Sequence, residues 1–77
     1  NLFIKQLTND FSTDSLVLSF IEQTKELITY QEYTLALENL LKSLLEKYIS
    51  IPRDTLAIID VVDDPYIKRL QASLWGV

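Results

Sequence analysis

The sequence contains no cysteine and no histidine among its 77 residues. Zinc sites of the usual kind need these ligands, and a helix-borne di-iron site needs Glu-x-x-His pairs, so both kinds of site are excluded. A Ser-His-Asp arrangement is excluded for the same reason. Lys25, Lys42 and Lys47 fall on polar helix faces, where their side chains stay solvated. A lysine has to be desolvated before it can act as a general base. We therefore expect no enzyme, no metal and no cofactor.

Turn-forming residues are scarce, since Gly76 is the only glycine and Pro52 and Pro65 are the only prolines. This shortage favours helices joined by short loops and leaves no room for a flexible linker. The chain is shorter than the usual domain of about 100 to 150 residues. Its hydrophobic fraction of 48% can fill one core without disulfides. We expect a single all-α domain over residues 1–77, a small bundle of four to five helices with short loops.

Long apolar runs are also lacking. No uncharged stretch approaches the roughly 20 apolar residues that span a membrane, and no basic segment precedes an apolar one near the N-terminus. Small secreted domains usually depend on disulfides, which this chain cannot form. We expect a cytoplasmic protein that does not bind a membrane.

Positive charge is in the minority, with 7 basic against 11 acidic residues and a net charge of -4. Proteins that bind nucleic acid gain affinity when Lys and Arg neutralise phosphates, so direct binding to nucleic acid is not expected. An acidic surface instead attracts a positively charged partner over a long range. The composition therefore indicates protein binding, with a basic protein as the partner.

Apolar residues at helical spacing predict a short leading helix over about residues 2–7. A second helix over about residues 15–29 has Asp14 or Thr13 as its cap, because these side-chain oxygens accept hydrogen bonds from unpaired amides of the first turn. The third and most strongly patterned helix covers about residues 32–49.

A fourth helix begins near Pro52, which is tolerated in a first helical turn. This segment is rich in β-branched residues, but a lone strand would have no partner, so a helix is the better assignment. Asp64 caps the last helix, with Pro65 at its first position and Gly76 at its end.

The apolar stripes of these helices predict the core. The stripe of the second helix comprises Leu16, Val17, Phe20, Ile21, Leu27 and Ile28. The stripe of the third comprises Tyr33, Leu37, Leu40, Leu41, Leu44, Leu45 and Tyr48, and that of the last comprises Tyr66, Ile67, Leu70 and Leu74. Tyr30, Leu18 and Trp75 fall outside these stripes, so we expect them at the surface.

The segment from Asp54 to Asp64 carries four acidic residues and no basic one. Asp54 and Asp64 are explained by helix starts, whereas Asp63 lies near a helix end, where the helix dipole disfavours an anion. Aromatic side chains outside the core are frequent binding anchors. The partner-binding residues that we predict are Glu22, Glu26, Glu32, Asp60, Asp63, Asp64, Tyr30 and Trp75.

Some carboxylates have alternative interpretations. Glu22 and Glu26 lie one helical turn apart, as paired metal ligands do, but beside Lys25 they are better explained as a solvated face. Glu38, at the edge of the third stripe, either pairs with Lys42 or accepts a hydrogen bond inside the bundle from a tyrosine hydroxyl or a helix start.

The segment Gln31-Glu32-Tyr33-Thr34-Leu35-Ala36-Leu37-Glu38-Asn39-Leu40 is followed by Leu44-Leu45-Glu46 and then by Ile51-Pro52. It resembles the central pattern of MafI-type immunity proteins, which are small helical antidotes to secreted bacterial toxins. The resemblance covers roughly residues 30–60 and consists of an acidic-aromatic start, an Ala-Leu-Glu-Asn-Leu core and a proline-started helix. Members often carry glycine before the Glu-Tyr pair, where this chain has Gln31.

The resemblance implies a cytoplasmic antidote that binds the C-terminal toxin domain of a polymorphic or contact-dependent growth inhibition toxin. Such a domain is commonly a nuclease and often an EndoU-type ribonuclease. A nuclease presents positive charge to phosphate, so an acidic inhibitor can occupy its active site. One alternative is a non-catalytic helical adaptor that dimerises through exposed Leu18 and Trp75. A more remote one is an acyl-carrier-like protein, since Asp14-Ser15-Leu16 has the letters of a phosphopantetheine site, although the usual long preceding helix is missing.

Overall fold

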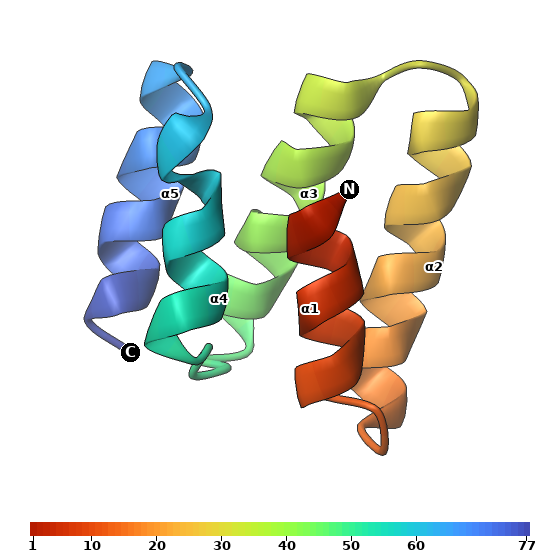
Figure 1. The fold of residues 1–77 in the computed structure, drawn as a ribbon, viewed down its shortest axis with the longest axis horizontal. Helices are drawn as coiled ribbons and strands as arrows, with labels where there is room; N and C mark the ends of the chain where they lie inside the picture. Colours follow the sequence, from red (N-terminus) through yellow and green to blue (C-terminus); the bar gives the residue numbers. More distant parts are fainter.

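The computed structural model describes all of residues 1–77 as five α-helices and one 3-10 helix, without a strand (Figure 1). The α-helices are α1 (Leu2–Asp10), α2 (Ser15–Thr29), α3 (Tyr33–Glu46), α4 (Arg53–Ala57) and α5 (Pro65–Trp75), and the 3-10 helix η1 (Ile58–Val61) continues α4. The expected all-α bundle with short loops is confirmed. None of the helices combines the length and the apolar character needed to cross a membrane.

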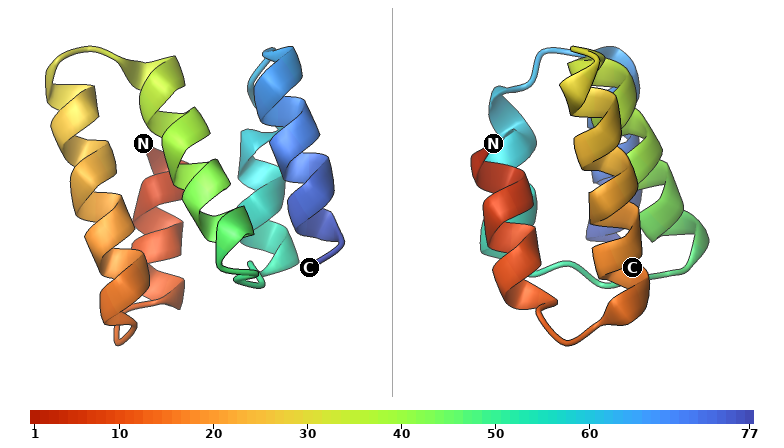
Figure 2. Two further views of the ribbon diagram at one scale, coloured as in Figure 1. Left: turned by 180° about the vertical axis from the view of Figure 1, so that it is seen from behind. Right: turned by 90° about the vertical axis from the view of Figure 1, so that its right-hand side faces the viewer.

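The helices lie in two layers (Figure 2). One layer consists of α2, α3 and α5, with α3 in the middle and packed against both neighbours. The other consists of α1 and the α4–η1 segment, which contact each other in front of the first layer (Figure 1). The α2–α3 turn and the η1–α5 connection lie at one end of the bundle, the upper end in Figure 1. This arrangement brings together two segments that are about 30 residues apart in the sequence.

Helix α3 forms the centre of the core. Its buried residues recur at helical spacing and are Ala36, Leu37, Leu40, Leu41 and Leu44. Side chains from every other helix and from the α3–α4 loop complete the core, namely Phe3, Ile4, Leu7, Val17, Ile21, Ile51, Leu56, Ile59, Ile67, Leu70 and Leu74. Full burial of one leucine stabilises the fold by about 1.5 to 3 kcal/mol, so this stripe is the main source of stability.

Side-chain caps begin three of the helices. Asn1, Asp14 and Asp64 each accept hydrogen bonds from two backbone amides of the following turn, at 2.8 to 3.3 Å. A cap of this kind stabilises a helix by about 1 kcal/mol. The predicted starts at Asp14 and at Asp64-Pro65 are therefore confirmed.

The C-terminal ends of α2 and α3 share a backbone motif. After α2, the amide of Gln31 donates to the carbonyl oxygen of Ile28 at 2.8 Å, and the amide of Glu32 donates to that of Leu27 at 3.1 Å. This pair of bonds is the Schellman motif, which needs a left-handed residue just past the helix. Gln31 takes that place with φ 62°, and Tyr48 does so after α3 with φ 53°.

This motif explains why the third helix is shorter than predicted. The sequence pattern extends it to about residue 49, but it ends at Glu46 because the chain reverses its backbone conformation at Tyr48. The prediction that Tyr33, Tyr48 and Tyr66 belong to the core is wrong, since all three are exposed, Tyr48 to 80%. Tyr33 and Tyr66 lie in the first turns of their helices, at the end of the bundle.

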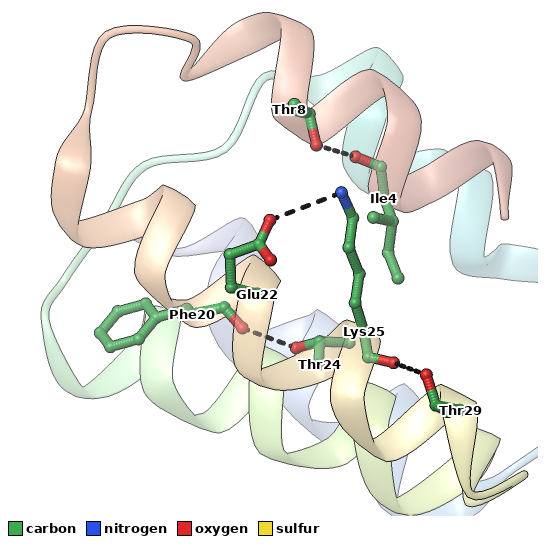
Figure 3. Close-up of polar contacts among 7 residues, drawn as sticks. All are labelled: Ile4, Thr8, Phe20, Glu22, Thr24, Lys25 and Thr29. Carbon is green, nitrogen blue, oxygen red and sulfur yellow. Dashed lines mark hydrogen bonds and ion pairs between the residues drawn. The ribbon is translucent and has the colours of Figure 1, made fainter.

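The buried face of α2 is also rotated from the predicted stripe. Leu18, predicted at the surface, is half-buried against the core, whereas Leu16 is exposed. Both differences arise because α1 covers one side of α2 while α3 covers another, which places Thr24 at the centre of the buried face. The Thr24 hydroxyl donates to the carbonyl oxygen of Phe20 at 2.9 Å, so its burial leaves no polar group unpaired (Figure 3).

We predict that Tyr48→Gly and Gln31→Gly each raise the free energy of unfolding by about 0.5 to 1 kcal/mol. A left-handed conformation costs a residue with a Cβ about 1 to 2 kcal/mol, and the extra freedom of glycine in the unfolded chain returns only part of this gain. Urea unfolding followed by circular dichroism measures the change.

Lys42→Gly is the matched control for both variants. Lys42 is an exposed residue inside α3, where glycine costs about 1 kcal/mol relative to a good helix former. If all three variants lost stability to the same extent, the two positive φ angles would not be a source of strain.

Candidate functional site

Most of the predicted partner-binding residues lie at one end of the bundle. This end is formed by the α2–α3 turn and the η1–α5 connection (Figure 1). The first turn of α3 lies between the two segments, and its Tyr33 and Thr34 line one hollow of about 160 Å³ together with Val62 and Ile67. We call this surface the acidic end. Its exposed or half-buried members are Tyr30, Glu32, Tyr33, Asp60, Val61, Asp63, Asp64 and Tyr66.

The acidic end carries four carboxylates and little positive charge. Neither residues 29–37 nor residues 54–67 include a lysine or an arginine. The first cation after the second of these ranges is Lys68, whose Nζ donates to the backbone carbonyl oxygen of Asp60 at 3.2 Å. A concentration of carboxylates of this kind produces a negative potential that reaches beyond the surface by about 8 to 10 Å at moderate salt.

Two of the four carboxylates also have structural roles. Oδ1 of Asp64 caps α5, where it accepts from the amides of Tyr66 and Ile67 at 2.9 and 3.0 Å. Oδ1 of Asp60 accepts a hydrogen bond from Nε2 of Gln71, a buried amide on α5. These bonds hold the two carboxylates in place and leave their second oxygens without an intramolecular hydrogen bond.

The other two carboxylates, on Glu32 and Asp63, make no hydrogen bond and no ion pair within the chain. Both residues are exposed. Glu32 occupies the cap position of α3, but its side chain accepts no bond there. The exposed Tyr30 ring precedes it by two residues. Glu32, Asp63 and Tyr30 can therefore contact a partner without losing an existing interaction.

Glu22 and Glu26 lie outside the acidic end, on the face of α2 that flanks α1. Glu22 pairs with Lys25 at 3.6 Å, and both side chains are largely in water (Figure 3). Glu26 shares this face because it follows Glu22 by one turn. No group of three or more carboxylates in the chain could hold a metal ion. The interpretation of this pair as a solvated face beside Lys25 is confirmed.

Trp75 lies at the opposite end of the bundle, since α5 runs from the acidic end to the C-terminus (Figure 1). Its ring is exposed, as predicted, and stacks under the guanidinium of Arg53, whose carbon is 5.9 Å from the ring centroid. A cation–π contact at an exposed site contributes about 0.5 to 1 kcal/mol. Trp75 therefore links the start of α4 to the end of α5 and belongs to a different surface from Tyr30.

Glu38 is half-buried but forms neither of its two expected contacts. The only ion pair of the chain joins Glu22 to Lys25, and no tyrosine hydroxyl or backbone amide donates to Glu38. The position of Glu38 at the edge of the apolar stripe is confirmed, while both proposed partners are wrong.

Two polar links between helices were not predicted from the sequence. The buried Thr55 hydroxyl donates to a carboxylate oxygen of Asp10, which joins α4 to α1. Gln71 Nε2 donates to the carbonyl oxygen of Leu56 at 3.0 Å as well as to Asp60. The only sequence signal was Gln71, a polar residue one position after Leu70 on an apolar helix face.

No protein-family model, no curated protein and no solved structure matches the chain. The candidate site therefore depends on the chain's own geometry. Of the eight predicted contacts, the fold brings Tyr30, Glu32, Asp60, Asp63 and Asp64 to one end.

We predict that Asp60→Ala lowers the free energy of unfolding by about 1 to 2 kcal/mol, because the buried Gln71 amide loses one of its two acceptors. Asp63→Ala, the matched control three residues later, should change it by less than about 0.5 kcal/mol. Chemical denaturation of both variants measures the difference. Equal stability of the two variants would contradict a structural role for Asp60.

Proposed function

We propose that this chain is an immunity protein that binds the C-terminal toxin domain of a secreted bacterial toxin and neutralises it. The toxin domain is a basic nuclease, with an EndoU-type ribonuclease as the preferred case. The main support is the acidic end, where Tyr30, Glu32 and Asp63 are exposed and the two carboxylates are free of internal contacts. The Gln31 to Pro52 sequence pattern provides the identity of the partner.

The charge of the acidic end suits a nuclease as the target. A nuclease site collects Lys and Arg to bind phosphate, so carboxylates held at the end of a rigid bundle can take the place of the phosphates. Asp60 and Asp64 are held in place by their hydrogen bonds to α5, which lowers the entropy lost on binding. Tyr30 adds an amphipathic ring, a type of residue that often carries much of the binding energy.

The backbone at Gln31 is compatible with the resembled family. Gln31 is the position where MafI-type proteins often have glycine, and in this chain it has φ 62°. Glycine adopts that conformation without strain, so a glycine there would preserve the same α2–α3 turn. The departure at Gln31 therefore does not require a different geometry at the acidic end.

The adaptor alternative assumes that Leu18 and Trp75 are both exposed. Leu18 packs against the core, and Trp75 is occupied by Arg53, which leaves that alternative without an apolar contact surface formed by these two residues. Toxin binding is the better-supported function for this reason.

Co-expression tests the proposal. A candidate toxin domain, taken from the C-terminus of a secreted protein encoded beside the gene for this chain, is expressed in a sensitive bacterium, alone or with this chain. We expect growth arrest with the toxin domain alone and normal growth with both proteins. Equal killing in the two cultures would rule out the immunity function.

We also predict that Glu32→Gln and Asp63→Asn each slow association with the toxin domain by about threefold to tenfold at low salt, because a lost carboxylate weakens long-range attraction. Surface plasmon resonance over about 0.05 to 0.5 M salt measures the rate, and the difference from the parent chain should disappear at high salt.

Glu46→Gln is the matched control for these rates. Glu46 is an exposed carboxylate at the C-terminal end of α3, whereas Glu32 lies at the N-terminal end of the same helix. Its loss should leave the association rate within about twofold of the parent. If Glu46→Gln slowed association as much as Asp63→Asn, net charge and not the acidic end would determine binding.

A further inference from the structure

A second surface adjoins the acidic end on the side of the front layer. It is a hollow of about 450 Å³ between the first turn of α1 and the α4–η1 segment. Its lining consists of residues 1–3, Leu37 of α3, and residues 57–62 other than Asp60. It shares Asn1, Leu37 and Val62 with the hollow at the acidic end, so the two hollows adjoin each other. We call the larger hollow the apolar groove.

The lining of the apolar groove is hydrophobic at eight of nine positions. Val61 and Leu2 at its edges are 88% and 64% exposed. Sites for small molecules usually add a few polar groups that fix the orientation of the ligand, and this groove offers only Asn1. The lining therefore fits apolar side chains of another polypeptide better than it fits a metabolite.

The geometry of the groove suits a helix. The front layer holds only α1 and the α4–η1 segment, whereas the back layer holds three helices (Figure 2). The chain has no strand whose edge could pair with an extended peptide. An amphipathic helix that lays its apolar face over Leu37 would complete the front layer by the packing that the bundle itself uses.

The charge around the groove determines the polar side of that helix. Asp63 directly follows the lining residue Val62, whereas Asp60 does not line the groove and is hydrogen-bonded to Gln71 of α5. Lys5, the only cation on α1, lines a separate hollow towards Lys25 of α2. A second copy of this chain would bring its own net charge of -4 and a second acidic end against the first. Repulsion between like charges disfavours a second copy and favours a basic segment.

We propose that the apolar groove binds an amphipathic α-helix with lysine or arginine beside its apolar face. The inference depends on the proposed function only for the origin of that helix, which would be the toxin domain. The apolar face of the helix covers Leu2 and Val61, and its cations face Asp63 at the acidic end.

A designed peptide tests this inference without the toxin. The probe is a fluorescein-labelled peptide of about 14 residues, made of leucine and lysine with the leucines at helical spacing. As a helix it is about 21 Å long, shorter than the 27 Å that the protein extends in the plane of its two layers. Fluorescence anisotropy measures its binding to the 77-residue chain.

Two control peptides separate shape from charge. One has the same composition with leucine at every second position, which favours a strand, and the other has glutamate in place of lysine. We expect both to bind at least about tenfold more weakly than the probe. If the alternating peptide bound as tightly, the helical requirement would be wrong. If the glutamate peptide bound as tightly, the charge requirement would be wrong.

Variants of the protein locate the site. Val61→Lys and Leu2→Lys place a cation in the groove at exposed positions, so the fold is expected to tolerate them, and both should weaken binding by about tenfold or more. Leu35→Lys is the matched control, because Leu35 is 45% exposed on α3 and does not line the groove. It should stay within about twofold of the parent. Equal weakening by all three variants would overturn the assignment of the groove.

The oligomeric state and the co-expression result complete the test. Sedimentation should find a monomer for the free chain, and a dimer that Val61→Lys dissociates would replace the proposed helix by a second copy. If the probe fails to bind while this chain still neutralises the toxin, the groove inference fails and the immunity function stands. If the probe binds at the groove while the toxin still kills, the immunity function fails and the groove inference stands.

Discussion

The burial of the leucine stripe on α3 is the constraint on which the rest of the structure depends. Leu40, Leu41 and Leu44 are almost fully inaccessible, and they lie between α2 and α5, behind the front layer. A small domain has a net stability of only about 5 to 15 kcal/mol, and truncation of one such leucine to alanine removes about 2 to 5 kcal/mol. Helices α2 and α5, which pack directly on α3, are therefore oriented by the face that each turns towards it.

The short front-layer elements need further support. Helix α4 has five residues, far below the length of about 12 to 15 residues at which an isolated helix becomes marginally stable in water. It is held by buried Leu56, by the hydrogen bond from Thr55 to Asp10 of α1, and by the Gln71 amide of α5, which reaches the Leu56 carbonyl oxygen. These links fix the position of η1, and with it both the acidic end and the apolar groove.

The acidic end combines structural and interaction roles in neighbouring carboxylates. Asp64 begins a helix and Asp60 satisfies a buried amide, so part of the negative charge follows from the requirements of the fold. Glu32 and Asp63 add charge that the fold does not use. The hydrogen-bonded carboxylates of Asp60 and Asp64 hold part of the negative electrostatic potential in a fixed position. The carboxylates of Glu32 and Asp63 remain free to pair with a partner.

The sequence by itself determined the fold class, the limits of α2 and the cap at Asp64, and it narrowed the cap of α2 to Asp14 or Thr13. These features depend on helical periodicity and on side chains that reach only two or three residues along the chain. It also identified Tyr30, Glu32 and Asp63 as surface residues. Only the tertiary structure decided that these three lie at one end, that Leu18 is covered while Tyr48 is not, and that Asp60 bonds to Gln71. Those outcomes depend on which helices become neighbours and where the chain turns, and contacts between distant segments leave no periodic trace in a single sequence.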